Sequence, residues 1–226
     1  MRVEIWSDVV CPWCYIGKRR FEQALERFLQ ATAAEGADGD GTDVDVEVVF
    51  RPFQLDPTAS PGVATPVSEV YSRKFGGPER AAQIIDRVTR IAADAGLTFR
   101  LDRAVRANTL LAHRLLWFAR REGGAAMQAS LKEALLEAYF TQGRNVADPD
   151  VLVGLAAEVG LDPTTARSFL DSDEGTTELM ADLAEAADND ITAVPTFVFD
   201  GRWVVPGAQD VDVFERVLQR VAAMTT

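Results

Sequence analysis

The sequence is poor in the residues that bind metals or cross-link small folds. Only two of its 226 residues are cysteine, and only one is histidine. A structural zinc site needs four ligands, usually two cysteine pairs or one pair with two histidines, so no metal site is predicted. Apolar residues make up 47% of the chain. This is enough for a hydrophobic core that needs no disulfide for its stability.

Positive charge and long apolar runs are also scarce. Lys and Arg number 23 against 35 Asp and Glu, which gives a net charge of -12. Because such a chain repels phosphate backbones, we expect no nucleic-acid partner. No apolar run approaches the ~20 residues of a membrane span, so no membrane partner is expected. The first strand pattern begins at Val3 and leaves no room for a secretory signal, which predicts a cytoplasmic protein.

The start of the chain shows the pattern of a β-α-β unit. Residues 2–6 form a short apolar stretch typical of a buried strand, and apolar residues then recur at helical spacing from about Pro12 into the low thirties. Residues 44–50 alternate in polarity and predict a half-buried strand. The Gly/Asp-rich stretch 35–43 predicts a mobile loop. A parallel strand pair joined by a right-handed crossover is therefore expected.

The middle of the chain shows a Pro-rich linker followed only by helical patterns. Two helix starts are marked by Asp148-Pro149 and Asp162-Pro163, each an N-cap followed by proline at the first helical position. This stretch predicts an all-helical insertion of roughly 120 residues inside the domain. Besides the two helices that begin at these prolines, the expected helices of this stretch cover residues 78–95, 103–121, 125–142 and 175–189.

The end of the chain returns to strand patterns. Asp200-Gly201 lies between the apolar runs 195–200 and 202–205 and predicts a hairpin, which a closing amphipathic helix follows. We therefore predict an α/β fold with a large all-helical insertion between its β-α-β and β-β-α halves. The expected division of the chain is 1–56, 57–185 and 186–226.

The two cysteines, Cys11 and Cys14, stand in "CPWC" between the first strand and the first helix. At a helix N-terminus, unpaired N–H groups and the helix dipole favour a thiolate, so Cys11 is predicted to be an exposed, reactive thiol. Cys14, one turn further in, is close enough to resolve a mixed disulfide at Cys11. The alternatives are a permanent disulfide, which a reducing cytosol disfavours, and two buried cysteines without chemistry. The position favours a redox pair.

A second signal is "ITAVPTFVFDG", residues 191–201, in which a proline stands at the head of a strand. Proline cannot donate to a strand ladder, so Pro195 could simply begin an edge strand. The functional interpretation is a cis Val194–Pro195 bond beside the cysteines. Such a turn would leave the Val194 backbone free to pair with an extended substrate, which makes Val194 and Pro195 substrate-binding candidates.

Together these features resemble the DsbA family of thioredoxin-fold proteins. More narrowly they resemble its cytosolic FrnE-type branch, which is related to 2-hydroxychromene-2-carboxylate isomerases and kappa-class glutathione transferases. The resemblance implies a thioredoxin-like fold, disulfide oxidoreductase or isomerase activity, and a cis proline at Pro195. It runs through nearly the whole chain in the segments "SDVVCPWCYIGKRRFE", "FRPFQLDP", "NTLLAHRLLWFA", "EALLEAYFTQGRNVADPDVL" and "VPGAQ".

Positions within the motif separate this chain from parts of that family. Secreted DsbA proteins carry His where Trp13 stands, and a Trp side chain cannot offer the thiolate the same hydrogen bond or charge. The isomerase and transferase relatives place Ser at the position of Cys11, so cysteine at both positions indicates redox chemistry here. Pro12 and Trp13 are expected to tune the pair. Trp13 could equally stack on a substrate or cap the motif.

Other candidates carry weaker signals. The single histidine, His113, lies among leucines in "NTLLAHRLL" and is more typical of a satisfied helix residue. The resemblance nevertheless places His113 and Asn108 on the insertion, facing the cleft above Cys11. Asp8 lies shortly before the motif, either as a charge that influences Cys11 or as a solvated turn residue.

The turn "PGAQD", residues 206–210, is the last candidate. In glutathione-binding relatives the corresponding turn holds the γ-glutamyl end of the ligand, which makes Gly207, Ala208 and Gln209 ligand candidates. The resemblance implies no tightly bound cofactor, and a low-molecular-weight thiol would act as a co-substrate.

The sequence thus predicts a thiol–disulfide oxidoreductase or disulfide isomerase in which Cys11 attacks and Cys14 resolves. Its expected partners are protein or small-molecule thiols and disulfides. One alternative is a thiol-dependent isomerase or transferase that acts on a small aromatic substrate, like 2-hydroxychromene-2-carboxylate isomerase. Another is a chaperone-like binding module in which the redox state of the pair switches a surface.

Overall fold

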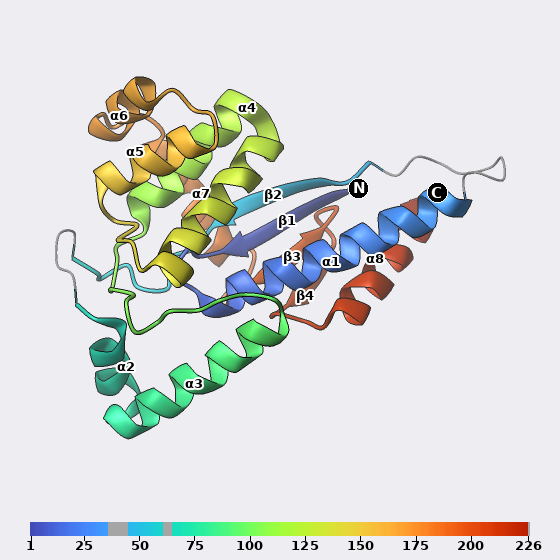
Figure 1. The fold of residues 1–226 in the computed structure, drawn as a ribbon. Helices are drawn as coiled ribbons and strands as arrows, with labels where there is room; N and C mark the ends of the chain where they lie inside the picture. The colour runs from blue at the N-terminus through green and yellow to red at the C-terminus, as the bar shows by residue number, and fades with distance from the viewer. Residues whose placement is uncertain (36–44, 61–64, 226) are drawn as a thin grey trace.

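The structure, a computed structural model, describes residues 1–35, 45–60 and 65–225. The expected mobile loop 35–43 lies outside the described residues, apart from Glu35. Figure 1 shows the arrangement of the elements. They follow one another as β1 (Arg2–Ser7), α1 (Pro12–Glu35), β2 (Glu47–Pro52), α2 (Val67–Phe75), α3 (Pro78–Asp94), α4 (Leu110–Glu137), the π-helical turn η2 (Ala138–Gln142), α5 (Pro149–Glu158), α6 (Pro163–Asp171), α7 (Thr176–Asp188), β3 (Thr196–Phe199), β4 (Trp203–Pro206) and α8 (Val211–Thr225).

Among the described residues, the strands form one mixed sheet in the order β2-β1-β3-β4. β1 and β2 are parallel, whereas β3 pairs antiparallel with both β1 and β4. The predicted crossover and hairpin are confirmed, and Asp200 and Gly201 turn the hairpin with positive φ angles of 47° and 65°. β3 is an inner strand, so the interpretation of Pro195 as the start of an edge strand is wrong.

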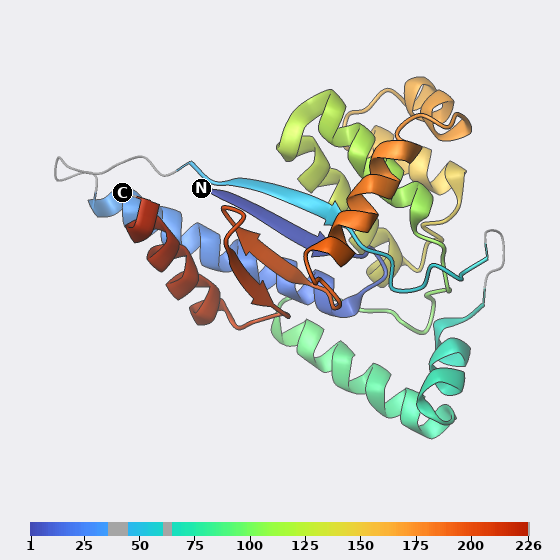
Figure 2. The same cartoon turned by 180° about the vertical axis from the view of Figure 1, so that it is seen from behind.

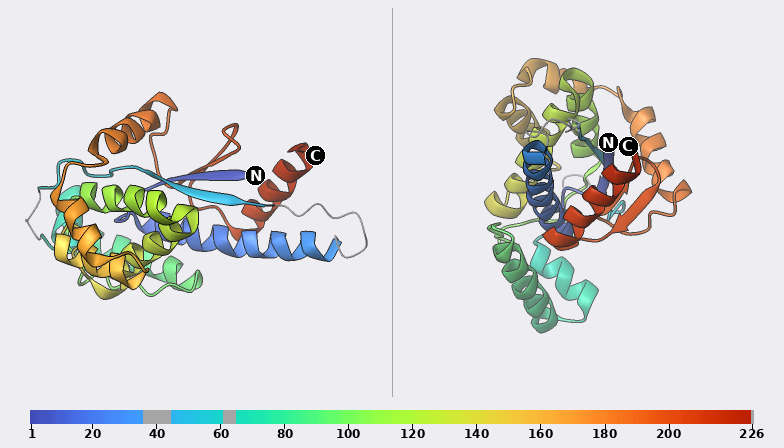
Figure 3. Two further views of the ribbon diagram at one scale, coloured as in Figure 1. Left: turned by 90° about the horizontal axis from the view of Figure 1, so that it is seen from above. Right: turned by 90° about the vertical axis from the view of Figure 1, so that its right-hand side faces the viewer.

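The alternation of β1 divides the core into two faces. Val3 and Ile5 point toward α1 and α8, which pack against each other on one side of the sheet. Trp6 points to the opposite face, where it packs against Ala186 of α7. Figure 2 shows α7 lying across that face, and the two views of Figure 3 show the sheet between α7 on one side and α1 on the other. β1 is therefore buried on both faces at the point where the chain enters the cysteine motif.

β2 differs from its prediction in position and burial. It covers Glu47–Pro52 rather than 44–50, and Val49 and Phe50 are both buried although they point to opposite faces. The half-buried pattern is wrong because α7 lies on the face that was expected to meet solvent, where Asp182 pairs with Arg51 at 3.2 Å. The helix α4 lies along the edge of the strand, where Gln128 bonds the Phe50 backbone. Val44 lies outside the described residues.

The helix α4 begins later than its sequence pattern predicted. The predicted start was residue 103, but the helix starts at Leu110, whose N–H donates to the Asn108 side-chain oxygen over 3.0 Å. At Gly123 and Gly124 the backbone dihedral angles leave the helical range. This break lies where the sequence predicted the end of one helix at 121 and the start of the next at 125. The predicted helices at 78–95 and 175–189 are confirmed as α3 and α7.

The predicted helix caps in the insertion are confirmed. The Asp148 and Asp162 side chains accept hydrogen bonds from the first turns of α5 and α6, with proline at the first helical position in each. The predicted division at residue 185 falls inside α7, which contacts β2 of the sheet. The division of the chain stays a prediction. Within residues 1–35, 45–60 and 65–225, no helix combines the length and the apolar character that a membrane crossing requires.

Candidate active site

The two cysteines are free thiols at the N-terminus of α1. The Cys11 carbonyl accepts the first helical hydrogen bonds, from the N–H groups of Cys14 at 3.1 Å and Tyr15 at 3.3 Å. Pro12 therefore occupies the first helical position, where its missing N–H has no role. The side chain of Trp13 is 40% exposed. The sequence placed the motif correctly at the junction of a strand and a helix.

The expected exposure of Cys11 is wrong. Cys11 is only 3% exposed and Cys14 only 2%, so both thiols are covered. The segment before β3 contributes to this burial, since the Val194 carbonyl oxygen lies 3.8 Å from the Cys11 sulfur. The two thiols are thus distinguished by position along the helix and not by exposure.

The segment before β3 lies against the Cys11 thiol. The Val194–Pro195 bond is cis, as predicted, and the Cys11 Sγ is 3.8 Å from the Val194 carbonyl oxygen, to which it donates. Residues 183 positions apart in the chain are brought together there. The place of Val194 is the one that substrate docking requires, and its docking role stays a prediction.

The turn at 206–210 lies beside that segment. The Gly207 N–H donates to the Pro195 carbonyl oxygen over 2.7 Å, and Gly207 takes a positive φ of 81°. The Ala208 carbonyl accepts from Arg20 of α1, and the Gln209 amide donates to the Pro206 carbonyl. The candidates Gly207, Ala208 and Gln209 are therefore close to the motif. The side-chain amide of Gln209, however, is engaged within the turn.

A buried charged cluster adjoins the pair. Asp8 is 0% exposed, and its carboxylate accepts from the Val9 and Leu55 N–H groups, each at 2.8 Å. His113 Nε2 lies 3.2 Å from the same carboxylate. The interpretation of Asp8 as a solvated turn residue is wrong, because the insertion and the 53–60 segment enclose it. His113 is a buried helix residue with a partner, as its surroundings predicted.

The ionisation of this cluster follows from its contacts. Burial favours the neutral acid at Asp8, but the His113 hydrogen bond and charge, with the Leu55 N–H, hold the pKa of Asp8 below its ordinary value. Burial raises the pKa of the Cys14 thiol well above its ordinary value, and a hydrogen bond and repulsion from Cys11 raise it further. Cys14 is therefore protonated at neutral pH in the reduced pair.

A pocket of about 370 Å³ opens beside the motif, between the sheet domain and the insertion. Its walls include Pro12 and the aromatic rings of Tyr71 and Tyr139. Burial and the nearby Cys11 raise the pKa of Tyr71 to about 12, which keeps its hydroxyl protonated. Lys74 and Arg106 also line the pocket, and Arg106 is paired with Asp56 at 2.6 Å.

Asn108 and His113, the two candidates on the insertion, were expected to face the cleft above Cys11, but they are placed differently. Asn108 uses its amide nitrogen to bind the Ala59 carbonyl at 2.8 Å and its oxygen to cap α4, so both ends are engaged within the chain. His113 does not line the pocket beside Pro12. It lines a separate small cavity on the side of α4 that faces β2 and α7.

Sequence reasoning missed Tyr71 and Lys132. Tyr71 carried no signal, since a single aromatic residue in a helix predicts only packing. Lys132 did carry one, because it occupies a buried position in the helical repeat of Gln128, Leu131, Leu135 and Leu136. A lysine at a core position of an amphipathic helix is unusual and could have been noticed.

The whole chain is similar to known proteins. The model of the DSBA-like thioredoxin domain matches residues 2–219. YwbO of Bacillus subtilis (strain 168), an uncharacterised protein, is 30% identical over 220 residues, which cover 96% of each chain. The crystal structure of SCO1869 from Streptomyces coelicolor, a probable DsbA oxidoreductase, is 38% identical with a TM-score of 0.85, covering 99% of this chain and 90% of that one.

Two more distant structures share the fold. A 2-hydroxychromene-2-carboxylate isomerase is 14% identical with a TM-score of 0.65, covering 100% of this chain and 98% of that one. The cytosolic disulfide reductase DsbM from Pseudomonas aeruginosa, solved with GSH, is 21% identical with a TM-score of 0.62, covering 99% and 100%. Both confirm the predicted thioredoxin-like fold. The chain belongs to the family of DSBA-like thioredoxin domain proteins.

Proposed function

We propose that this protein is a thiol–disulfide oxidoreductase in which Cys11 attacks and Cys14 resolves. The observation that carries the proposal is the pairing of two free thiols one helical turn apart, with the first at the N-terminus of α1. Cys11 occupies the N-terminus of α1, whereas burial raises the pKa of the Cys14 thiol and keeps it protonated at neutral pH. This is the division of roles that disulfide exchange requires.

The reaction proceeds in two exchanges. The Cys11 thiolate attacks a substrate disulfide, forms a mixed disulfide and releases one substrate sulfur as a thiolate. Cys14 then loses its proton and attacks Cys11, which releases the second substrate sulfur and leaves a Cys11–Cys14 disulfide. The substrate is reduced by two electrons and the protein is oxidised by two. In the reverse direction the same steps oxidise a dithiol.

The oxidised pair must be reduced again for the next turnover. We propose a dithiol protein or a low-molecular-weight thiol as the electron donor, in a cytoplasmic setting. The structure of DsbM, a cytosolic disulfide reductase, contains GSH. In this chain, the turn from Gly207 to Gln209 and the pocket beside Pro12 are where such a thiol would reach Cys11.

A second candidate function is favoured by that pocket. Its volume of about 370 Å³ and its two tyrosine rings suit a small aromatic substrate, as in a thiol-dependent isomerase or transferase. Such an enzyme would use Cys11 and a bound thiol without needing Cys14. The two functions therefore differ in their dependence on the resolving thiol.

The test is a redox titration of the pair combined with insulin reduction by wild-type, Cys14→Ser and Cys11→Ser proteins. We expect the wild type to reduce insulin, and Cys14→Ser to accumulate mixed disulfides at Cys11 with nearly complete loss of turnover. The matched Cys11→Ser control should form no mixed disulfide. Full turnover of a small aromatic substrate by Cys14→Ser would favour the second candidate, and no insulin reduction by the wild type would reject the first.

A further inference from the structure

Lys132 is a buried cation in the middle of α4. The residue is 1% exposed, and its Nζ has no hydrogen-bond partner among the residues that the structure describes. It lies near the ring of Phe50, whose centroid is 5.6 Å from Nζ. Burying an ammonium group is costly unless an opposite charge or hydrogen-bond acceptors compensate it. A lysine at this position therefore calls for a counter-charge.

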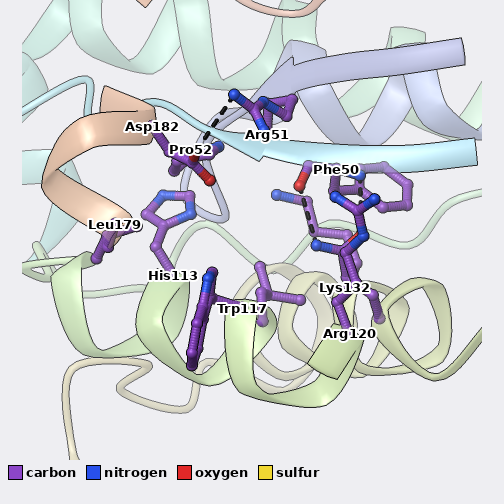
Figure 4. Close-up of a pocket in the computed structure, with 11 residues that line it drawn as sticks. Phe50, Arg51, Pro52, His113, Trp117, Arg120, Lys132, Leu179 and Asp182 are labelled. Atoms are coloured by element: carbon purple, nitrogen blue, oxygen red, sulfur yellow. Dashed lines mark hydrogen bonds and ion pairs between the residues drawn. The ribbon is translucent and has the colours of Figure 1, made fainter. Parts of the chain in front are cut away.

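The side chain of Lys132 lines a small cavity between α4, β2 and α7 (Figure 4). The cavity measures about 20 Å³, which is room for one water molecule or one ion of similar size. Apolar side chains, among them Leu116, Leu179 and Phe50, form part of its wall. Charges in such a partly apolar space are screened less than charges on the protein surface.

Positive charge predominates in the wall of this cavity. The charged or titratable groups that line it with Lys132 are Arg51, His113, Arg120 and Asp182. Asp182 is the only carboxylate among the described residues of the wall, and it pairs with Arg51 at 3.2 Å. Its charge is therefore already balanced by an arginine, which leaves Lys132 and Arg120.

These two cations have no counter-charge of their own. Within the described part of the chain, Lys132 and Arg120 form no ion pair. The buried Asp8 carboxylate accepts two backbone hydrogen bonds and contacts His113, and it does not line the cavity. Burial lowers the pKa of Lys132 to about 8, so the ammonium form still predominates at neutral pH. The cavity is thus a positively charged site in a chain whose net charge is -12.

We propose that this cavity binds one small inorganic anion, of the size of chloride, between the Lys132 ammonium and the Arg120 guanidinium. The ion accepts hydrogen bonds from both groups and compensates the buried charge of α4 without a carboxylate in the core. Sulfate and phosphate have five heavy atoms each and exceed the available volume. The inference concerns a separate site and does not depend on the proposed redox activity.

A water molecule is the alternative occupant of the same volume. It would accept a hydrogen bond from Lys132 but would leave both positive charges uncompensated. An anion that contacts Lys132 and Arg120 also removes the repulsion between them. Because an ion that binds only the folded chain stabilises it by mass action, stability should depend on the concentration of the anion.

Thermal unfolding of the full chain tests the site, with chloride itself as the probe. The chloride concentration is raised from zero to about 0.15 M, while sodium gluconate keeps the ionic strength constant. We expect the unfolding midpoint of the wild type to rise by about 3–5 °C, as for a ligand that reaches about ten times its Kd. Bromide should act like chloride, and sulfate at equal ionic strength should not.

Substitutions in α4 show whether the cavity causes the effect. Lys132→Met should abolish the chloride dependence, and Arg120→Met should weaken it. Arg121→Met is the matched control, because Arg121 is the next residue of α4 but pairs with Glu122 and Glu174 outside the cavity. This variant should respond to chloride as the wild type does. If Lys132→Met does not fold, Lys132→Gln replaces it.

Crystals soaked in bromide locate the ion directly. We expect a peak of anomalous scattering in the cavity, in contact with Lys132 Nζ, and no peak there in crystals of the Lys132 variant. A wild-type cavity without bromide would overturn the proposal.

Three results in solution would also overturn it. Equal rises of the unfolding midpoint in the wild type and in Lys132→Met would show a general effect of salt. No rise in the wild type would show that the cavity does not bind chloride. An equal rise with sulfate would show that the effect does not come from a cavity of this size.

Discussion

The sulfur of Cys11 lies 3.8 Å from the backbone carbonyl oxygen of Val194. The first residue caps α1 and the second precedes β3, and the pairing of β1 with β3 brings these two segments together. The Cys11 thiol and the backbone segment before β3 thus share one end of the sheet. Contacts and burial of this kind lead to four predictions about the cysteine site and the residues that pack around it.

The two thiols should react in a fixed order. We expect iodoacetamide at neutral pH to label Cys11 well before Cys14, because burial and the neighbouring Cys11 raise the pKa of the Cys14 thiol well above its ordinary value. Mass spectrometry of quenched samples gives the two rates. In protein unfolded by guanidinium the rates should converge. Faster labelling of Cys14 in the folded protein would reverse the assignment of attacker and resolver.

Gly17 should be required for the close packing of α1 against the segment at Val194 and Pro195. A Cβ at this position would lie 3.0 Å from Pro195 Cγ and 3.3 Å from Ala208, so Gly17→Ala should displace the segment that lies over Cys11. Overpacking costs about 1–3 kcal/mol, which exceeds the gain of about 1 kcal/mol from replacing a helical glycine. We expect peptide-disulfide reduction to fall more than Cys11 alkylation.

Gly154→Ala in α5 is the matched control for Gly17. The added Cβ would meet only the end of the flexible Arg144 side chain at 3.4 Å. We expect this variant to be more stable by up to about 1 kcal/mol, with unchanged activity. If Gly17→Ala behaves in the same way in thermal unfolding and in both assays, the contact with Pro195 does not position the segment.

Gln128 should stabilise the β2 edge of the sheet, which α4 covers. Its side chain accepts from the Phe50 N–H at 2.9 Å and donates to the Phe50 carbonyl at 3.0 Å, so one helix residue satisfies both backbone groups of the edge strand β2. Gln128→Leu leaves two buried groups unpaired and should cost about 2–4 kcal/mol in urea unfolding. The exposed Gln30→Leu should change stability by less than about 0.5 kcal/mol. If both variants lose similarly little unfolding free energy, Gln128 does not stabilise the edge strand β2.

Lys132→Met should stabilise the protein at neutral pH, and the gain should depend on pH. The pKa of Lys132 is lowered to about 8 in the folded chain, against about 10.4 when unfolded. Below pH 8 both states are protonated, and the folded wild type bears the full cost of the buried charge. Between the two pKa values the unfolded state binds more protons, so wild-type stability rises with pH relative to the variant.

The expected gain of Lys132→Met at pH 7 is of the order of 2–3 kcal/mol and shrinks toward pH 10. Urea unfolding at pH 7, 8.5 and 10 measures it. A gain that is constant over this range would show that the lysine does not change its protonation there. A loss of stability at pH 7 would show that the ammonium makes favourable contacts in the folded state.

Local patterns were sufficient to predict the parts of this fold that depend on nearby residues. Strand alternation, the "CPWC" motif before a helix, the proline-capped helices at Asp148 and Asp162 and the Asp200-Gly201 turn each depend on backbone chemistry within a few residues. The errors arose where another element intervened. β2 was expected to be half-buried because its own seven residues could not show that α4 and α7 cover it.

The sequence by itself determined that two cysteines stand at a strand–helix junction, because that follows from spacing and periodicity along the chain. Only the tertiary structure decided that both thiols are covered, that Asp8 is buried against His113, and that Lys132 of α4 is buried. Burial and charge proximity depend on residues more than a hundred positions apart. Their side chains meet only after the helical insertion has packed on the sheet, so no local pattern contains them.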